Sequence, residues 1–397
     1  MKLHHRINAE LAELERTGNL RQLRDVRPEG AYLLHEGRRY LNLSSNDYLG
    51  LTASPYADVP LRDYWDATFG RECRSPFDHG NPASRLMTGN SGEYAVLERE
   101  IAALFPGREA LVLGCGYLVN SELMEALTGK DDLILADKLV HASMIEGLRC
   151  TEATFRRFRH NDVEHLEHLL RTASPRGDIW VLVESLYSMD GDLAPLREIV
   201  ELKRRYGFHL CVDEAHSFGV RGPRGAGYCA ELGLDEEVEL LVCTFGKALA
   251  GAGACVVCPP LVRQYLINRL RPLIFSTALP PCTLQWDAMI LHEMHSPTLT
   301  QQGLPPLAAL REKLSALIAH FNRQTGHHAL SQIIPLPAGS NERALAMAEQ
   351  GRRTGLWLTA IRHPTVPLGH ARIRLSLHAG LTPEQLTPLI SLCNNHG

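Results

Sequence analysis

The sequence predicts an α/β protein with a large, mostly parallel sheet and a smaller α+β domain at its carboxyl end. Short apolar runs alternate with helical stretches from residue 110 to residue 244, and this alternation is typical of parallel strands covered by helices on both faces. The alternation stops near Pro280 and Pro281, and the chain of 397 residues is long enough to bury more than one core. We therefore expect an N-terminal helix-and-strand segment over residues 1–43, a large α/β domain over 44–283 and a small domain over 284–397.

The N-terminal segment begins with a charged amphipathic stretch, which predicts a helix from Leu3 to about Arg24. A strand is expected over residues 38–43, and it leads into the sequence SSNDYLGL, in which Asn46 and Asp47 indicate a turn. Residues 77–92 are rich in Gly, Asn, Ser and Pro, and we interpret them as a long loop. Ordered loops of this length are often functional, although a plain surface excursion fits the composition equally well.

The remaining elements follow from the two periodicities of helices and strands. Runs of β-type apolar residues mark the strands, and the stretches between them mark the helices. In the large domain we expect strands at 110–114, 133–137, 155–158, 179–184, 208–213 and 240–244, and helices at 117–127, 142–149, 163–172 and 196–206. In the small domain we expect strands at 332–336, 356–362 and 371–377, a helix at 341–353 and a closing helix after Thr382.

Composition and charge exclude several classes of protein. The formal net charge of −4 provides no basic field for nucleic acid or an anionic membrane. The first residues lack the apolar core of a signal peptide, and no apolar run approaches the ~18 residues of a transmembrane helix. The ten cysteines are scattered, and the one close pair, Cys255 and Cys258, cannot by itself close a tetrahedral zinc site. We therefore expect no metal, no nucleic acid, no membrane and a reducing, cytoplasmic compartment.

A lysine follows one of the apolar runs. Lys247 comes three residues after the strand expected at 240–244, within the sequence LLVCTFGKALAGAGA. The carboxyl end of a strand is where open α/β sheets bind ligands. A lysine buried there either pairs with an anion or loses its proton, and the neutral amine is a nucleophile that forms Schiff bases with aldehydes. For a lone lysine, the alternative is an ordinary surface charge just past a strand.

Asp213 and His216 supply the second half of this pattern. Asp213 ends the strand expected at 208–213, and His216 follows it in the sequence VDEAHSFG. A pyridoxal phosphate site needs an amine for the aldehyde, a carboxylate beside the pyridine nitrogen and a donor for the ring hydroxyl. Each residue alone could instead be a helix cap or a core histidine. On two successive strands, together with Lys247, they favour the cofactor.

Other residues could complete such a site. Gly116 and Tyr117 join a strand to a helix, where backbone N–H groups can bind a phosphate, although a plain structural turn is the alternative. His141 could lie flat on a planar cofactor or cap a helix. Arg374 alternates with apolar residues in an expected strand. Its planar guanidinium could hold a substrate carboxylate, or it could point outward as an edge charge.

His165 and His168 lie three residues apart among glutamates, so a metal pair is conceivable. No third ligand is evident in the sequence. A solvated amphipathic helix face is therefore the better interpretation.

Several long motifs extend across the chain. They are SSNDYLGL from Ser44, FRHND from Phe158, ESLYSMDGDLAPL from Glu184, VDEAHSFGVRGPRGAG from Val212, TFGKA from Thr244, FSTALPP from Phe275 and LTAIRHPTVPLGHARIRLSL from Leu358. On these motifs the chain resembles the α-oxoamine synthases, pyridoxal phosphate enzymes of the aspartate-aminotransferase-type fold (fold type I). Within the family it is most similar to members that join L-alanine to a pimeloyl thioester, carried on coenzyme A or on a carrier protein.

The resemblance implies catalytic roles for four residues. Lys247 would hold the cofactor covalently, Asp213 would pair with its ring nitrogen, and His141 would stack on its ring. His216 would hydrogen-bond near the ring oxygen, together with Ser188.

The resemblance also implies how the phosphate and the substrates are held. The family's site lies at a homodimer interface, so two of the cofactor residues would reach across from a second subunit. The phosphate would be held by Gly116, Tyr117 and Thr244, with Ser276 and Thr277 from that second subunit. The carboxylate of the amino acid would bind at Asn46 and Arg374, and the path of the acyl substrate would be lined by Arg21 and Thr365.

One position departs from the family pattern. Relatives carry a Ser- and Gly-rich loop followed by a histidine before a Leu-Glu pair, whereas this chain reads HGNPASRLMTGNSGEYAVLE, with Tyr94 in place of that histidine. In the family this loop lies near the acyl path, so the acyl chain and its carrier stay open.

Other functions fit the sequence less well. Another member of the family could use glycine or a different acyl thioester, as a glycine C-acetyltransferase or an acyl-aminoketone signal synthase does. An aminotransferase is a further alternative, as is a catalytically inactive partner subunit, which would be expected to lack Lys247. A dinucleotide-binding oxidoreductase is excluded, because no G-x-G-x-x-G motif follows the first strand.

Overall fold

The computed structural model describes residues 2–394 and divides into two compact units. The larger unit comprises residues 55–188 and 192–311. The smaller unit comprises the residues up to Ser54, the segment Met189–Gly191 and the residues from Glu312 onward. These units differ from the expected ranges, because the N-terminal strand segment pairs with the C-terminal part of the chain, residue Leu41 with Leu356.

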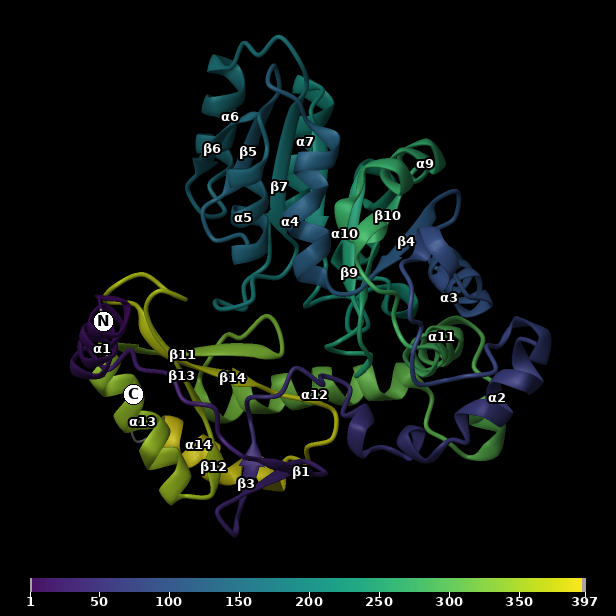
Figure 1. Ribbon diagram of the computed structural model, residues 1–397. Coiled ribbons are helices and arrows are strands. Elements are labelled where there is room, and N and C mark those ends of the chain that lie inside the picture. Colours follow the sequence, from purple (N-terminus) through teal and green to yellow (C-terminus); the bar gives the residue numbers. More distant parts are fainter. Residues whose placement is uncertain (1, 395–397) are drawn as a thin grey trace. The chain divides into compact units, whose positions relative to one another are not determined.

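Seven strands form one sheet in the larger unit, in the order β4–β10–β9–β8–β7–β5–β6 (Figure 1). Neighbouring strands from β6 to β9 are parallel, and β10 alone runs antiparallel to both of its neighbours. Every residue of β5, β9 and β10 is buried, as expected for strands covered on both faces. The strands are β4 (Glu109–Leu113), β5 (Leu133–Asp137), β6 (Thr154–Phe158), β7 (Ile179–Glu184), β8 (His209–Asp213), β9 (Leu240–Thr244) and β10 (Ala254–Cys258).

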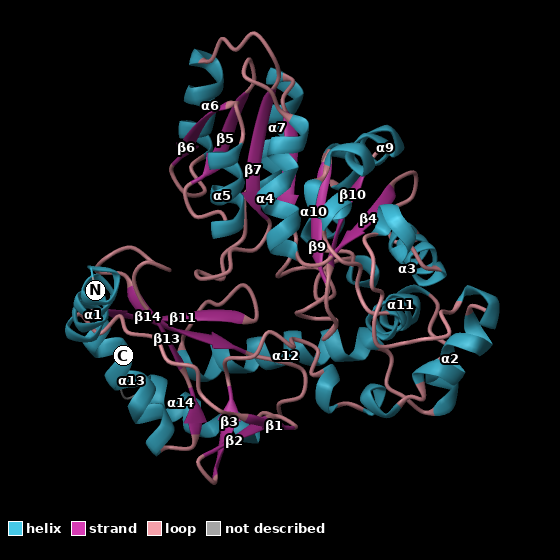
Figure 2. Ribbon diagram, viewed as in Figure 1, coloured by secondary structure: helices cyan, strands magenta, loops and turns pink. Residues whose placement is uncertain are grey.

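Helices flank this sheet, as the cyan and magenta ribbons of Figure 2 show. Apolar side chains of α4, α5, α9 and α10 share one core with side chains of the sheet. The helices of the larger unit are α2 (Leu61–Thr68), α3 (Gly92–Ala102), α4 (Gly116–Leu127), α5 (Ala142–Cys150), α6 (Val163–Thr172), α7 (Leu196–Tyr206), α8 (Tyr228–Glu231), α9 (Pro260–Arg269), α10 (Arg271–Phe275) and α11 (Pro281–His295).

The smaller unit contains two further sheets, one in the order β1–β2–β3–β12 and one in the order β11–β14–β13. Its strands are β1 (Arg27–Glu29), β2 (Tyr32–His35), β3 (Arg38–Asn42), β11 (Ile333–Gly339), β12 (Leu356–Trp357), β13 (Thr359–Ile361) and β14 (Ala371–Ser376). Its helices are α1 (Lys2–Arg16), α13 (Asn341–Arg353) and α14 (Thr387–Asn394), and α12 (Leu307–Thr325) spans the sequence boundary with the larger unit. The mixture of helices and mostly antiparallel strands confirms the predicted α+β character.

Three elements differ from the sequence-based expectation. Helix α1 ends at Arg16, well before Arg24, and Gly18 just beyond it adopts a left-handed φ of 65°. The strand expected at 356–362 is two strands, because β12 pairs with β3 and β13 pairs with β14 in the other sheet. Strand β10 is not expected from the sequence. It returns antiparallel to β9 after a short Gly-rich connection, where the alternating pattern calls for a helical crossover.

No helix within residues 2–394 combines the length and the apolar character that crossing a lipid bilayer requires.

Candidate active site

A cavity of about 310 Å³ lies at the carboxyl ends of the parallel strands in the larger unit. Glu184, Asp213 and Thr244, the last residues of β7, β8 and β9, all line it. This edge is where open α/β sheets bind ligands. Seven of the predicted site residues line the cavity: Gly116, Tyr117, His141, Asp213, His216, Thr244 and Lys247.

Lys247 lies in the loop between β9 and β10, and its side chain is half-buried. Two contacts from α11 order this loop. The indole N–H of Trp286 donates to the Leu249 carbonyl at 2.8 Å, and Gly251 packs against Asp287 so closely that a Cβ atom there would overlap the carboxylate. The lysine is therefore presented to the cavity by a fixed backbone, which suits a group that must meet one particular atom of a ligand.

Asp213 and Glu184 lie side by side, paired across β8 and β7. Asp213 is buried; its Oδ2 accepts from Asn120 Nδ2 at 2.6 Å, and its Oδ1 accepts from the Ala215 N–H at 2.8 Å. Burial, together with the charge of Asp213, raises the pKa of Glu184 well above its usual value. The cavity therefore contains a firmly oriented carboxylate beside a carboxyl group that favours its protonated form.

The start of helix α4 provides an anion-binding end to the cavity. Its N-cap, Cys115, makes no side-chain capping hydrogen bond, and its first turn contains no acidic residue. The free N–H groups and the dipole of a twelve-residue helix attract a phosphate. Glycine is favoured at position 116, because a Cβ atom there would approach Thr244 Cγ2 to 2.5 Å and force one of the two to move.

His141 is both a helix cap and a cavity residue. It is the N-cap of α5, and its Nδ1 accepts from the Ser143 N–H at 3.3 Å. Burial lowers the pKa of His141, the Asp213 carboxylate opposes this effect, and the Lys247 cation adds to it. The two interpretations offered by the sequence are therefore compatible, with a fixed and predominantly neutral ring at the cavity wall.

Three predicted cofactor residues are not among the described residues that line this cavity. Ser188 is buried just beyond β7, and its N–H donates to Glu184 Oε2 at 3.1 Å. Ser276 and Thr277 follow α10 and are exposed, and Thr277 forms a β-bridge with Ser84 of the 77–92 loop.

The four predicted substrate residues form two pairs within the smaller unit. Arg374 of β14 is buried, and it donates to Asn46 Oδ1 at 3.2 Å and to the Tyr48 hydroxyl at 3.1 Å. Arg21 donates to Thr365 Oγ1 at 3.4 Å in an exposed pair. Arg374 therefore points into a polar cluster, which overturns the default interpretation of an outward edge charge.

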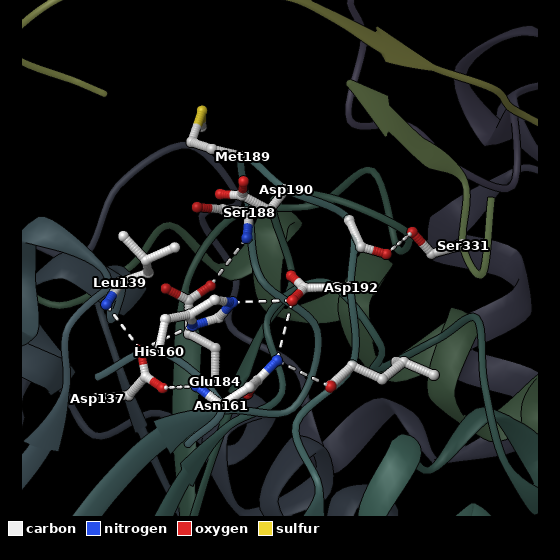
Figure 3. Close-up of polar contacts among 12 residues, drawn as sticks. Asp137, Leu139, His160, Asn161, Glu184, Ser188, Met189, Asp190, Asp192 and Ser331 are labelled. Atoms are coloured by element: carbon white, nitrogen blue, oxygen red, sulfur yellow. Dashed lines mark hydrogen bonds and ion pairs between the residues drawn. The ribbon is translucent and has the colours of Figure 1, made fainter. Parts of the chain in front are cut away.

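Residues of the FRHND motif fasten the segment between β7 and α7 (Figure 3). His160 Nδ1 lies 2.9 Å from Asp137 Oδ1, and its Nε2 lies 2.8 Å from Asp192 Oδ2. Asn161 makes the same link, because its N–H donates to Asp137 at 2.8 Å and its amide donates to Asp192 at 2.9 Å. The Asp192 carbonyl in turn accepts from the Tyr187 N–H at 3.0 Å. The turn that follows Glu184 is thus held to the end of β5.

Replacing His160 with glutamine is expected to remove a pH dependence of stability. Burial disfavours the charged ring, but hydrogen bonds with Asp137 and Asp192 outweigh this effect and raise the pKa of His160 to about 10. The pKa is about 6.5 in the unfolded chain, so the stabilisation is complete below about pH 6.5 and is lost as the pH rises through 10.

Urea unfolding of both proteins at pH values across this window tests the expectation. As the pH rises, the free energy of unfolding of the native chain should fall by on the order of 2–5 kcal/mol more than the free energy of unfolding of His160→Gln. An equal fall in both proteins would show that His160 carries no proton-linked stabilisation.

Tyr94 replaces the histidine of the family pattern as a buried structural residue. Its hydroxyl accepts from the Leu279 N–H at 2.7 Å, and the Arg85 guanidinium lies over its ring, 4.0 Å from the centroid. Arg85 also donates to Glu98 at 2.6 Å. The 77–92 loop is therefore an ordered element, with a π-helical turn at Arg85–Gly89, that is tied to the FSTALPP segment.

The sequence assigns no role to Asn120, Glu184 or His160, although the last two lie in motifs that carry the family resemblance. Glu184 ends an expected strand as Asp213 does, so the same strand-end argument could have found it. Asn120 lies four residues after Gly116, one helical turn from the phosphate-binding start of α4, and this spacing could have indicated a shared face. His160 lies in the FRHND motif, but no local pattern indicates its partners, because both carboxylates are more than 20 residues away.

Comparisons with known proteins agree with this geometry. The family model "Aminotransferase class I and II" matches residues 38–392. A relative from Chlorobaculum parvum, described as 8-amino-7-oxononanoate synthase, is 44% identical over 367 residues, which cover 91% of each chain. A solved serine palmitoyltransferase from S. paucimobilis, with PLP and myriocin bound, is 25% identical with a TM-score of 0.84 and covers 98% of this chain and 96% of its own. An 8-amino-7-oxononanoate synthase from Francisella tularensis is 24% identical with a TM-score of 0.69, covers 90% and 97%, and supports the fold. The predicted fold class is confirmed.

Proposed function

We propose that this chain, which belongs to the class I and II aminotransferase family of pyridoxal phosphate enzymes, joins L-alanine to a pimeloyl thioester. The products are 8-amino-7-oxononanoate, carbon dioxide and the free thiol of the acyl carrier. One observation carries the proposal: a lysine, a buried aspartate and an uncapped helix start share one cavity in a chain that is 44% identical to a relative of that name.

The described residues of the cavity fit pyridoxal phosphate. Without a Cβ atom, Gly116 lets Thr244 approach the start of α4, and both residues line the cavity at this phosphate-binding end. Lys247 lines the same cavity and offers an amine for the aldehyde. Two buried polar atoms on the wall, Glu184 Oε1 and Asn120 Oδ1, lack a hydrogen-bond partner, which is costly unless a ligand or water supplies one. When bound, the cofactor accepts the electron pair that is left on the α-carbon of the substrate.

Lys247 has two tasks in this reaction. Its Nζ would hold the cofactor through the aldehyde carbon and would be freed when the amine of alanine takes that place. The freed amine then takes the proton from the α-carbon of alanine and later returns a proton to that carbon. The ordered loop described above keeps Nζ within reach for both transfers.

Asp213, His141 and His216 control the electrostatics around the ring. The Asp213 carboxylate, oriented by Asn120, favours a protonated ring nitrogen, which strengthens the cofactor as an electron acceptor. His141, being predominantly neutral, can stack on the ring without adding a competing charge. His216, with Ser188, would hydrogen-bond near the ring oxygen.

Residues of the smaller unit bind the two substrates. Arg374 and Asn46 bind the carboxylate of alanine, and their mutual hydrogen bond orients the guanidinium for that contact. Arg21 and Thr365 line the acyl path. The active form is a homodimer in the cytoplasm, in which Ser276 and Thr277 reach the phosphate of the second subunit; their exposure in the single chain is consistent with that role.

The bonds of the reaction balance without a further reactant. The α-carbon of alanine attacks the thioester carbonyl carbon, the C–S bond breaks, and the thiol leaves. The bond to the carboxylate then breaks and releases carbon dioxide, and a proton takes its place on the α-carbon.

Substrate comparison tests the proposal. The purified holoenzyme should release coenzyme A from pimeloyl-coenzyme A in the presence of L-alanine, and its kcat/KM should be at least tenfold higher than with glycine and acetyl-coenzyme A or with L-serine and palmitoyl-coenzyme A. A parallel assay with pimeloyl-carrier protein in place of pimeloyl-coenzyme A shows which acyl carrier the enzyme prefers. A preference for either of the other two pairs would move the chain to another activity of the same family.

A further inference from the structure

A second group of ligating side chains lies in the larger unit. Glu100 of α3 faces His292 and His295 of α11, which are spaced one helical turn apart. His292 Nδ1 and His295 Nε2 each lie 2.9 Å from the same carboxylate oxygen, Glu100 Oε2. The ligand atoms of these three side chains all lie within 4.8 Å of one another. Among the described residues, 2–394, no other group of three or more His, Cys, Asp or Glu side chains meets this criterion.

We propose that Glu100, His292 and His295 bind a divalent transition metal ion of the zinc class. Two imidazole nitrogens and one carboxylate oxygen form a donor set that zinc prefers, with a fourth position open to water. Zinc bonds of about 2.0–2.2 Å at tetrahedral angles separate neighbouring donor atoms by roughly 3.3–3.5 Å. The present 2.9 Å contacts therefore need to open by only a few tenths of an ångström.

The side chains around the group orient its ligands. Arg99 lies 3.5 Å from Oε1 of Glu100 and leaves Oε2 directed at the two histidines. The ring of Phe69 packs edge-on against His292, with 5.3 Å between centroids. Partners of this kind fix ligand geometry around metals. The Glu100, His292 and His295 side chains retain 7%, 16% and 15% exposure, so an ion can enter from solvent.

The donor types of the group suit a divalent cation. A carboxylate supplies a negative charge, and the neutral imidazole is the form of histidine that binds metals. A metal ion would tie helix α3 to helix α11, and since none of its three ligands lines the cavity that contains Lys247, its role would be structural.

The chain contains a matched control. His165 and His168 on α6 have the same spacing of three residues, but within the described residues no third ligand joins them. His165 Nδ1 instead accepts from the Arg159 N–H at 2.9 Å. A double substitution of this pair removes as many histidines as one at His292 and His295 without touching the proposed site.

Calorimetric titration of the holoenzyme with Zn²⁺, after dialysis against a chelator, tests the proposal. The native protein should bind one ion per chain, His165→Gln/His168→Gln should bind it equally, and His292→Gln/His295→Gln should bind at least tenfold more weakly. Zn²⁺ should also raise the unfolding midpoint by on the order of a few degrees, except in the His292/His295 variant.

The single variant His295→Gln gives the same comparison if the double variant does not fold. Equal affinity in the native protein and in a folded ligand variant, or no tight binding by the native protein, would overturn the proposal. Neither result depends on the reaction catalysed at Lys247.

Discussion

Lys247→Ala is expected to reduce kcat by at least about 10³–10⁴-fold, because the substitution removes both the covalent attachment point and the group that moves the α-proton. Reduction of the native protein with borohydride, followed by peptide mass spectrometry, should place the cofactor on the peptide that contains Lys247. The variant should bind the cofactor without this attachment.

Lys130→Ala is the matched control for this experiment. Lys130 is an exposed lysine between α4 and β5, and the cavity is lined by other residues. This variant should retain native turnover and native labelling at Lys247. Turnover above a few per cent in Lys247→Ala, or labelling of another lysine in the native protein, would contradict the role assigned to Lys247.

Asp213→Asn is expected to lower kcat by about 10²–10⁴-fold while the cofactor still binds. Asparagine keeps the shape of the side chain but removes the charge that favours a protonated ring nitrogen. The loss should appear in kcat more than in the KM for alanine, because the charge matters when electrons accumulate on the substrate carbon rather than when the substrate binds.

Glu184→Gln distinguishes this effect from a general disturbance of the cavity wall. Glu184 occupies the neighbouring strand end, and burial already favours its neutral form. Glutamine resembles that form, so the loss of kcat should be smaller than for Asp213→Asn. Equal losses in the two variants would show that the charge of Asp213 has no special role.

The sequence predicts most elements of the large sheet, because they depend on local patterns, and the same patterns bring several predicted site residues to one cavity. The bounds of β5, β7, β9, α6, α7 and α13 are those expected from periodicity. Lys247 and Asp213 are found by the rule that ligands bind at the carboxyl ends of parallel strands. The resemblance to the α-oxoamine synthases adds residues such as Arg374, whose inward direction a strand pattern alone leaves open.

The features that the sequence does not predict depend on contacts between distant segments. The run expected as one strand at 356–362 divides because each half finds a partner in a different sheet. His160 gains its role from Asp137 and Asp192, and the spacing of His292 and His295 acquires meaning only when Glu100 lies opposite. No periodicity encodes such pairings, because they are determined by how the elements pack.

The fate of the alanine carboxyl group tests the proposed reaction most directly. The holoenzyme is given pimeloyl-coenzyme A and L-alanine labelled with ¹³C at the carboxyl carbon and with ¹⁵N at the amine. The account predicts that the ¹³C leaves as carbon dioxide, in equal amount with free coenzyme A, and that the ¹⁵N is retained in 8-amino-7-oxononanoate. A parallel assay also contains a 2-oxo acid as amine acceptor. Recovery there of the ¹³C in pyruvate and of the ¹⁵N in the amino acid formed from the acceptor, without carbon dioxide or free coenzyme A, would contradict the account and identify an aminotransferase.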